Sequence, residues 1–370
     1  MGSKQTNPAE RSEGSRQPSG SGHRRERSRK RRMAVIAAWS VGCLLLICGA
    51  AGGAVLWKLN HNIKSVDIDK ALGSDRPAAS TKGAENILVL GSDSRSGAAN
   101  QALGGGSTGD TARSDTAMIV HVNQDHSRAT VVSIPRDTLV SRPECTTGSG
   151  TTVAAATSVM FNTAYETGGA TCAVKTVEAM TGLRMDHYIE VDFSGFAKLI
   201  DALGGVDVTT TIDIHDSKSH LDLPKGTHHL DGRTALAFVR TRHGIGDGSD
   251  LGRIQLQQQM VKAVATKVAS LDLFGDPTRL YSIADAATSA VTTDSNLGSV
   301  TSLVSFGESL RKIKTADITT VTLPNETAPA DVNRVVPKEP EATDLWTALQ
   351  NDQAVPDSVL KLQIRNPADS

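Results

Sequence analysis

Residues 116–134 read TAMIVHVNQDHSRATVVSI, and this stretch predicts two paired strands at the centre of the fold. Residues 116–122 and 129–134 are mostly apolar and rich in β-branched side chains, as strands of a buried sheet are. Residues 123–126 are Asn, Gln, Asp and His, a polar group that is typical of a turn. Pro135 lacks the N–H that a sheet hydrogen bond needs, so it ends the second strand.

A further buried strand precedes this pair at residues 86–91, NILVLG. We expect the three strands to form an antiparallel meander. The end of the first, the start of the second and the end of the third then share one edge of the sheet. The charged residues at that edge are Asp93, Arg95, Arg113, Asp115 and Arg136. Strand order alone therefore predicts that carboxylates and guanidinium groups gather in one place.

A second charged stretch, residues 236–259, reads LAFVRTRHGIGDGSDLGRIQLQQQ. Arg240 and Arg242 are two positions apart, so an extended segment would point both side chains the same way. After three glycines, Ser249 or Asp250 is expected to cap a helix that begins close behind it.

That helix would place Arg253 and Gln257, four positions apart, on one face. Helix N-termini favour anions, and arginine forks match phosphate oxygens in pairs. The stretch therefore predicts a pocket for a phosphate or a pyrophosphate. The alternative is a solvated basic surface.

Strand and helix patterns alternate through the remaining sequence, which predicts an α/β domain. We expect three layers, α/β/α, around a central mixed and largely antiparallel sheet. The expected helices cover 158–167, 170–181, 193–203, 231–238, 251–270, 278–291, 297–313 and 342–349. The remaining expected strands cover 187–193, 206–210 and 318–323, and residues 213–230 are expected to form a hairpin or lid.

The N-terminal part divides by composition. Residues 1–32 carry ten Lys or Arg against three Glu and are expected to form a disordered basic cytoplasmic tail. Residues 33–57 contain no charged side chain and predict a transmembrane helix with the later residues outside the cell. A cleaved signal peptide is the alternative, although the basic and apolar runs are long for one. We expect an extracellular stalk at 58–84, a catalytic domain at 85–352 and a flexible tail at 353–370.

Composition also bears on partners and bound metals. The formal net charge is −1, so no overall field draws the chain to nucleic acid, and the basic tail suits anionic lipid better. Cys145 and Cys172 fall outside the expected span, where thiols oxidise, and are predicted to pair. No CxxC spacing indicates a zinc site, and the histidines of residues 215–229 lack ligand spacing.

Asp93 and Asp115 would repel each other unless a cation lies between them. Magnesium takes one or two carboxylates and completes its shell with phosphate oxygens and water. Arginines would bind the remaining phosphate charge. A cation and arginines around phosphate groups are typical of a phosphoryl-transfer site. The sequence has no GxSxG, HExxH, Walker or Rossmann pattern in its proper context.

Seven segments in order carry a resemblance to a known family: NILVLGSDSR, RSDTAMIVHV, VVSIPRDT, FNTAYETGG, FSGFAKLIDALGGVDV, LDGRTALAFVRTR and DLGRIQLQQQ. The chain resembles the LytR–CpsA–Psr family of bacterial cell-wall proteins, from about residue 86 to residue 259. The Ala- and Gly-rich sequence is similar to members from high-GC Gram-positive bacteria. Met160 and Leu256 stand where members often have lysine and arginine.

The resemblance implies a membrane-anchored phosphotransferase. Such an enzyme moves a glycopolymer from a polyprenyl-pyrophosphate carrier to the C6 hydroxyl of N-acetylmuramic acid in peptidoglycan. It implies Mg²⁺, with Mn²⁺ as a substitute, near Asp93 and Asp115. It implies pyrophosphate binding by Arg95, Arg113, Arg136, Arg240, Arg242, Arg253 and Gln257. The polyprenyl tail is expected in an apolar groove.

Three functions remain open at this point. The first is the transferase, with Asp93, Asp115, Arg136, Arg240 and Arg242 as catalytic residues and Asp250 or Asp247 as the base. The second is a polyprenyl-pyrophosphate hydrolase that uses the same site. The third is a non-catalytic lipid-binding or regulatory membrane protein.

Overall fold

The computed structural model describes residues 2, 46–80, 83–92, 114–242, 245, 250–271 and 276–364. Contacts divide the chain into two compact units, Met1–Leu56 and Trp57–Ser370. The expected tail at 1–32 and most of the expected span at 33–57 lie outside the described residues. A helix runs over residues 46–62, and among the described residues no helix has the length and apolar character needed to cross a bilayer.

The second unit contains a seven-stranded sheet with the order β1-β14-β9-β2-β3-β4-β15. Its strands are β1 (Lys64–Val66), β14 (Val291–Asp294), β9 (His187–Asp192), β2 (Glu85–Ser92), β3 (Ser114–Val122), β4 (Ala129–Ile134) and β15 (Ile318–Thr322). β2, β3 and β4 are antiparallel neighbours, which confirms the expected meander. The sheet is mixed, as predicted.

The expectation of a largely antiparallel sheet is wrong for the strands that the structure describes. β9 runs parallel to β2, β15 runs parallel to β4, and β1 runs parallel to β14. The other three pairings are antiparallel. Parallel neighbours are joined by long crossovers, so the local sequence pattern does not reveal them.

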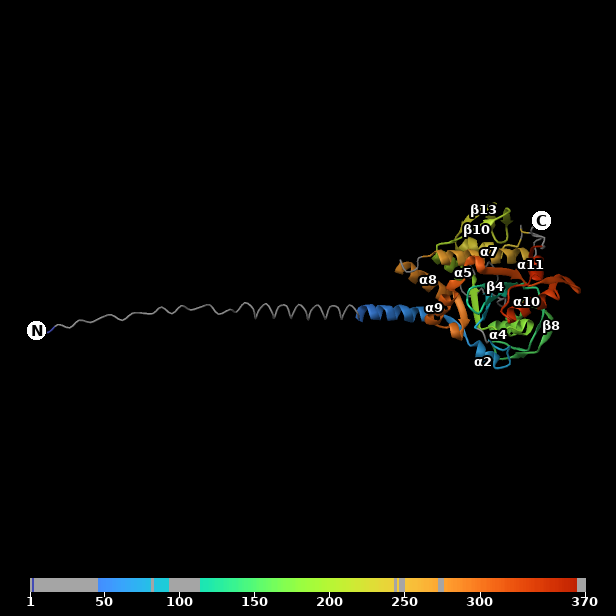
Figure 1. The fold of residues 1–370 in the computed structure, drawn as a ribbon, viewed down its shortest axis with the longest axis horizontal. Helices are drawn as coiled ribbons and strands as arrows, with labels where there is room; N and C mark the ends of the chain where they lie inside the picture. Colours follow the sequence, from blue (N-terminus) through green and yellow to red (C-terminus); the bar gives the residue numbers. More distant parts are fainter. Residues whose placement is uncertain are drawn as a thin grey trace. The chain divides into compact units, whose positions relative to one another are not determined.

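Alternating residues of β2 and β3 face opposite layers. Leu88 and Ile119 belong to a core cluster that also holds residues of α4 (Asn162–Thr181) and α10 (Glu341–Gln350). On the opposite face, Gln258 of α7 (Asp250–Ser270) donates to Ser133 and Thr322 of β4 and β15. Figure 1 shows α4 and α10 on one side of β4, with α7 on the other. The sheet is thus covered by helices on both faces.

A second core cluster lies beneath α7. It contains residues of α5 (Phe193–Leu203) and α6 (Gly232–Arg240), together with two small sheets. One sheet pairs β10 (Val206–Thr210) with β13 (Gly226–Leu230), and the other pairs β11 (Ile214–Asp216) with β12 (Leu221–Leu223). The polar stretch expected to form a hairpin or lid is therefore a packed hairpin.

The expected stalk at 58–84 is wrong for its described residues. β1 joins the edge of the main sheet, and α2 (Ile68–Leu72) buries Ile68 in the first core cluster. Arg76 binds the buried carboxylate of Glu178 through Nε and Nη2. These segments have few apolar residues, and their partners lie far away in the sequence.

The expected flexible tail at 353–370 is also wrong for residues 353–364. α11 (Asp357–Ile364) packs on the first core, where Val359 is fully buried. Gln363 exchanges two hydrogen bonds with the backbone of Thr322 in edge strand β15. This edge contact holds the helix in place despite its polar sequence.

Two smaller expectations also differ from the structure. Residues 158–160, expected as the start of a helix, belong to β8 (Ala156–Met160), which pairs with β5 (Leu139–Arg142). The expected glycine break in the following helix is present, since Gly168 and Gly169 have non-helical angles. A hairpin of β16 (Asn325–Ala328) and β17 (Asp331–Pro337) was not expected at all. Two further helices are α8 (Pro277–Ala290) and α9 (Val300–Ser309).

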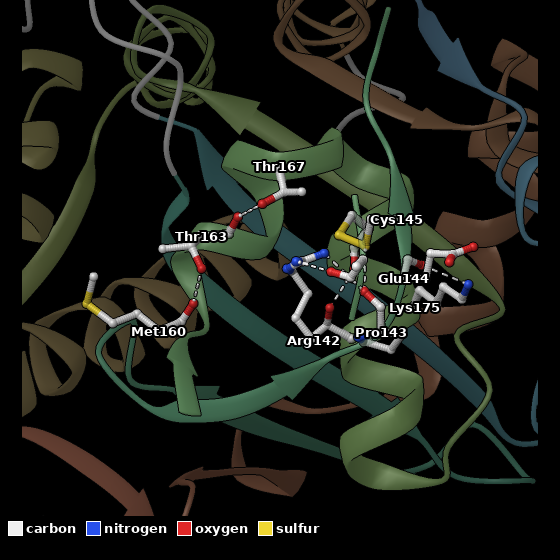
Figure 2. Close-up of a disulfide and its surroundings, with 11 residues drawn as sticks. Arg142, Pro143, Glu144, Cys145, Met160, Thr163, Thr167 and Lys175 are labelled. Carbon is white, nitrogen blue, oxygen red and sulfur yellow. Dashed lines mark hydrogen bonds between the residues drawn. A yellow bond between two sulfur atoms is a disulfide. The ribbon is translucent and has the colours of Figure 1, made fainter. Parts of the chain in front are cut away.

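Cys145 and Cys172 form the predicted disulfide. It joins β6 (Cys145–Thr146) to α4, just beyond the glycine break. Figure 2 shows the bond beside Arg142, a buried side chain that donates to the carbonyl oxygens of Pro143 and Ala154. The start of α4 also supports the residues after β4, because the Asn162 N–H donates to the carbonyl oxygen of Arg136.

Candidate functional site

A cavity of about 400 Å³ lies between the main sheet and the α5–α6–α7 layer. Its apolar part is formed by side chains such as Met118, Phe196, Leu236 and Met260. Its charged part contains Asp115, Asp192, Asp216, Lys218, Arg240, Arg242 and Arg253. The cavity thus joins an apolar chamber to a cluster of cations.

Arg240 and Arg242 reach the cavity from the end of α6. Arg240 is the last residue of that helix, and its guanidinium carbon lies 4.6 Å from the ring centroid of Phe193. Thr241 turns the chain into an extended conformation. The expected extended segment is therefore wrong at Arg240, yet both side chains line the same cavity.

α7 brings Arg253 and Gln257 to the sheet from one face, as their spacing predicted. Arg253 is buried, and its Nη2 donates to the backbone oxygen of Asp115 over 2.7 Å. Gln257 Nε2 donates to Thr116 Oγ1 over 2.8 Å. Burial lowers the pKa of the Arg253 guanidinium, and Asp250 offsets part of that effect. These bonds fix the start of β3 against the helix.

Asp115 is the anionic centre of the cluster. Its Oδ1 accepts from Arg136 Nη1 over 2.8 Å and lies 3.7 Å from Arg242 Nη2. Burial raises the pKa of this carboxyl, but Arg253, Arg136 and Arg242 outweigh burial and hold it below its usual value. Asp115 is therefore ionised at neutral pH, which suits a ligand for a cation better than a base.

Asp250 occupies the first turn of α7 and binds two of the arginines. Its Oδ1 lies 2.6 Å from Arg253 Nη2 and 3.7 Å from Arg136 Nε. Both carboxylate oxygens, and the Nε atoms of Arg136 and Arg253, are buried without a hydrogen bond among the described residues. These side chains have ion-pair contacts, and the hydrogen bonds that their buried atoms lack mark a place where a polar ligand or water binds.

Four of the residues expected at the site lie outside the described residues: Asp93, Arg95, Arg113 and Asp247. The strand that precedes Asp93 is described, and it ends at the cavity, where Leu90 and Gly91 line the wall. The structure brings together the other expected residues, namely Asp115, Arg136, Arg240, Arg242, Asp250, Arg253 and Gln257.

Sequence reasoning missed Asp192, Phe193, Asp216 and Lys218, which also line the cavity. Asp192 is paired in register with Ser92, because β9 runs parallel to β2. Asp192 lies near the end of an expected strand, and this position could have placed it in the predicted site. No sequence feature pointed to Asp216 or Lys218, because a polar hairpin usually forms a solvated surface.

The described residues fit a magnesium site in part. Asp115 Oδ2 makes no hydrogen bond within the described part of the chain, so it remains available to a cation. No group of three or more His, Cys, Asp or Glu in the described ranges is placed to hold a metal. Magnesium bound with phosphate oxygens needs only one or two carboxylates.

Comparisons with known proteins agree on one family. The model of the LytR_cpsA_psr family matches residues 55–351. The probable cell wall biosynthesis protein LcpB of Corynebacterium glutamicum is 34% identical over 262 residues, which cover 68% of this chain and 58% of LcpB. The chain thus spans less than two thirds of the length of that relative.

A second relative is the polyisoprenyl-teichoic acid–peptidoglycan teichoic acid transferase TagT of Bacillus subtilis. It is 33% identical over 260 residues, which cover 67% of this chain and 74% of TagT. A solved structure of TagT bound to LI-WTA is similar with a TM-score of 0.56 at 26% identity, and the match covers 78% of this chain and 98% of that chain.

Proposed function

Since this chain belongs to the LytR_cpsA_psr family, we propose that it transfers a glycopolymer from a polyprenyl-pyrophosphate carrier to peptidoglycan. The acceptor in this proposal is the C6 hydroxyl of N-acetylmuramic acid. The relative TagT bears the name of a teichoic acid–peptidoglycan transferase, which supports the same class of reaction here.

The observation that carries the proposal is the composition of the cavity. Its apolar chamber suits an isoprenoid chain, while Arg240, Arg242 and Arg253 suit a diphosphate. A water-soluble nucleotide would leave the apolar walls unfilled. A lipid without a phosphate group would place no negative charge beside Arg240 and Arg242.

The proposed step is a substitution at phosphorus. The acceptor oxygen forms a bond to the sugar-side phosphorus, the bond from that phosphorus to the bridging oxygen breaks, and polyprenyl phosphate leaves. The hydroxyl proton passes to a base. Arg136 and Arg242, which both face Asp115 Oδ1, are placed to bind charge on the phosphoryl oxygens.

Asp250 is better suited to hold arginines than to accept this proton. Its carboxylate contacts Arg253 over 2.6 Å and Arg136 over 3.7 Å. We therefore assign Asp250 as a positioning residue in the proposal. Asp247 lies outside the described residues and stays a candidate base.

In the same proposal, Asp115 contributes one carboxylate to a bound Mg²⁺, or to Mn²⁺ in its place, with Asp93 as the second ligand. Bound there, the ion would neutralise phosphate charge. Asp115 is prepared for this role because the surrounding arginines keep its pKa low.

We further propose that residues 33–57 anchor the protein in the cell membrane with the catalytic domain outside. The support is the run of uncharged residues behind a strongly basic tail. An anchored domain would meet a lipid-linked donor at the membrane surface.

The test uses the full-length protein in detergent, a synthetic polyprenyl-pyrophosphate oligosaccharide and soluble peptidoglycan fragments. Mass spectrometry should detect a phosphodiester-linked product that requires added Mg²⁺. Arg242→Ala should reduce the rate by at least about a hundredfold. Arg311→Ala, which changes an exposed arginine outside the cavity, is the matched control and should leave the rate unchanged.

Two outcomes would overturn the transferase proposal. Release of polyprenyl phosphate at a rate independent of acceptor, without a linked product, would identify a hydrolase. Donor binding without release of any phosphate would identify a non-catalytic lipid-binding protein.

A further inference from the structure

The turn between β11 and β12, residues 217–220, forms part of the cavity wall. Its hairpin is packed against the domain, because Ile214, Leu221 and Leu223 are buried in the second core cluster with Phe238 of α6. Lys218 and Ser219 of this turn line the cavity.

Asp216 fixes the turn to the arginine segment. It is 2% exposed, and its Oδ1 accepts from the Lys218 N–H over 2.9 Å. Its Oδ2 accepts from the Arg242 N–H over 3.0 Å. Ser219 and Thr241 add a hydroxyl–hydroxyl bond of 2.7 Å. One buried carboxylate therefore holds the backbones of Lys218 and Arg242 together.

The ammonium group of Lys218 has no anionic partner among the described residues, in contrast to Lys58, which contacts Asp285 over 3.1 Å. An unpaired lysine is ordinary on a protein surface. Lys218 is exposed, but it also lines the cavity that contains Arg240 and Arg242. A phosphate group in the cavity would be attracted by all three cations.

We propose that Lys218 is a further diphosphate-binding residue, which contacts the lipid-linked pyrophosphate from the β11–β12 turn. The inference rests on the proposed function for the identity of the donor. The compact ammonium with its rotatable donors suits a phosphate oxygen. The turn supplies a contact that neither the strand ends nor the arginine stretch provides.

The test measures binding, so it does not depend on turnover. Full-length protein in detergent is titrated with polyprenyl pyrophosphate and, separately, with polyprenyl monophosphate, in the presence of a metal chelator. Lys218→Ala should weaken pyrophosphate binding by about tenfold, the size of one hydrogen bond to a charged group. Monophosphate binding should weaken less, and Lys218→Arg should bind within about threefold of the wild type.

Lys225→Ala is the matched control. Lys225 belongs to the same polar stretch, is exposed and does not line the cavity, so its loss should leave both affinities unchanged. Thermal unfolding of each variant checks that the fold is intact.

Equal pyrophosphate affinity in Lys218→Ala and Lys225→Ala would refute the assignment. An effect confined to the KM of the peptidoglycan acceptor would refute it as well. A wild-type protein that binds pyrophosphate through Lys218 but transfers nothing would instead refute the proposed function alone.

Discussion

Arg253 Nη2 donates to the backbone oxygen of Asp115 across 2.7 Å, although the two residues stand 138 positions apart in the chain. This bond joins the first turns of α7 to the start of β3. It unites the two charged stretches of the sequence in one site. Asp250 completes the contact on the helix side.

Removal of the Arg253 side chain should destabilise the protein. Arg253→Met leaves the buried carboxylate oxygens of Asp250 without their closest cation, and breaking a buried pair typically costs about 3–5 kcal/mol. The measurement is urea unfolding. The double variant Asp250→Leu/Arg253→Met should recover part of the loss, since no charge remains unpaired. If the losses of stability in Asp250→Leu and Arg253→Met simply added in the double variant, this coupling would be contradicted.

Gly91→Ala should narrow the cavity at the end of β2. A Cβ at Gly91 would lie 3.0 Å from the Thr116 Cβ and 3.2 Å from its Oγ1, which accepts from Gln257. We expect weaker donor binding and a lower melting temperature. Gly307→Ala in α9 is the control, because its Cβ meets nothing within 4 Å and alanine favours a helix. Equal donor affinities and equal melting temperatures for Gly91→Ala and Gly307→Ala would contradict the close contact.

His187 should make stability depend on pH. Burial lowers the pKa of His187, but the carboxylate of Asp294 at 3.2 Å outweighs it, so the folded pKa lies above the ordinary 6.5. The stabilisation is then complete below pH 6.5 and is lost as pH rises through the raised pKa. Urea unfolding of the wild type and His187→Gln should differ most at acidic pH. A difference that grew toward alkaline pH would contradict this sign.

Loss of the disulfide should destabilise the region behind Arg136. The bridge spans 27 positions, and the double variant Cys145→Ser/Cys172→Ser should lose about 3 kcal/mol. Thermal unfolding with and without reductant measures the effect. Cys48→Ser is the control, because Cys48 is exposed and unpaired. Equal unfolding temperatures for the double variant and the Cys48→Ser control would show that the bridge contributes no stability.

Local patterns predicted the parts of the fold that depend on neighbouring residues. The meander of β2, β3 and β4 follows from apolar runs separated by polar turn residues. The bounds of α5 at 193–203 follow from its apolar spacing and the two glycines behind it. The disulfide followed from two thiols in the part of the chain that is expected to lie outside the cell.

Helix and strand periods fix which side chains lie together. The sequence therefore predicted the shared face of Arg253 and Gln257, and it predicted that charged residues gather at one end of the meander. Tertiary structure alone decided that β9 and β15 pair in parallel, that residues 64–76 and 357–364 complete the domain, and that Asp216 holds Lys218 beside Arg242. These relations join segments far apart in the chain. They arise from the burial of whole surfaces against one another, which no local period records.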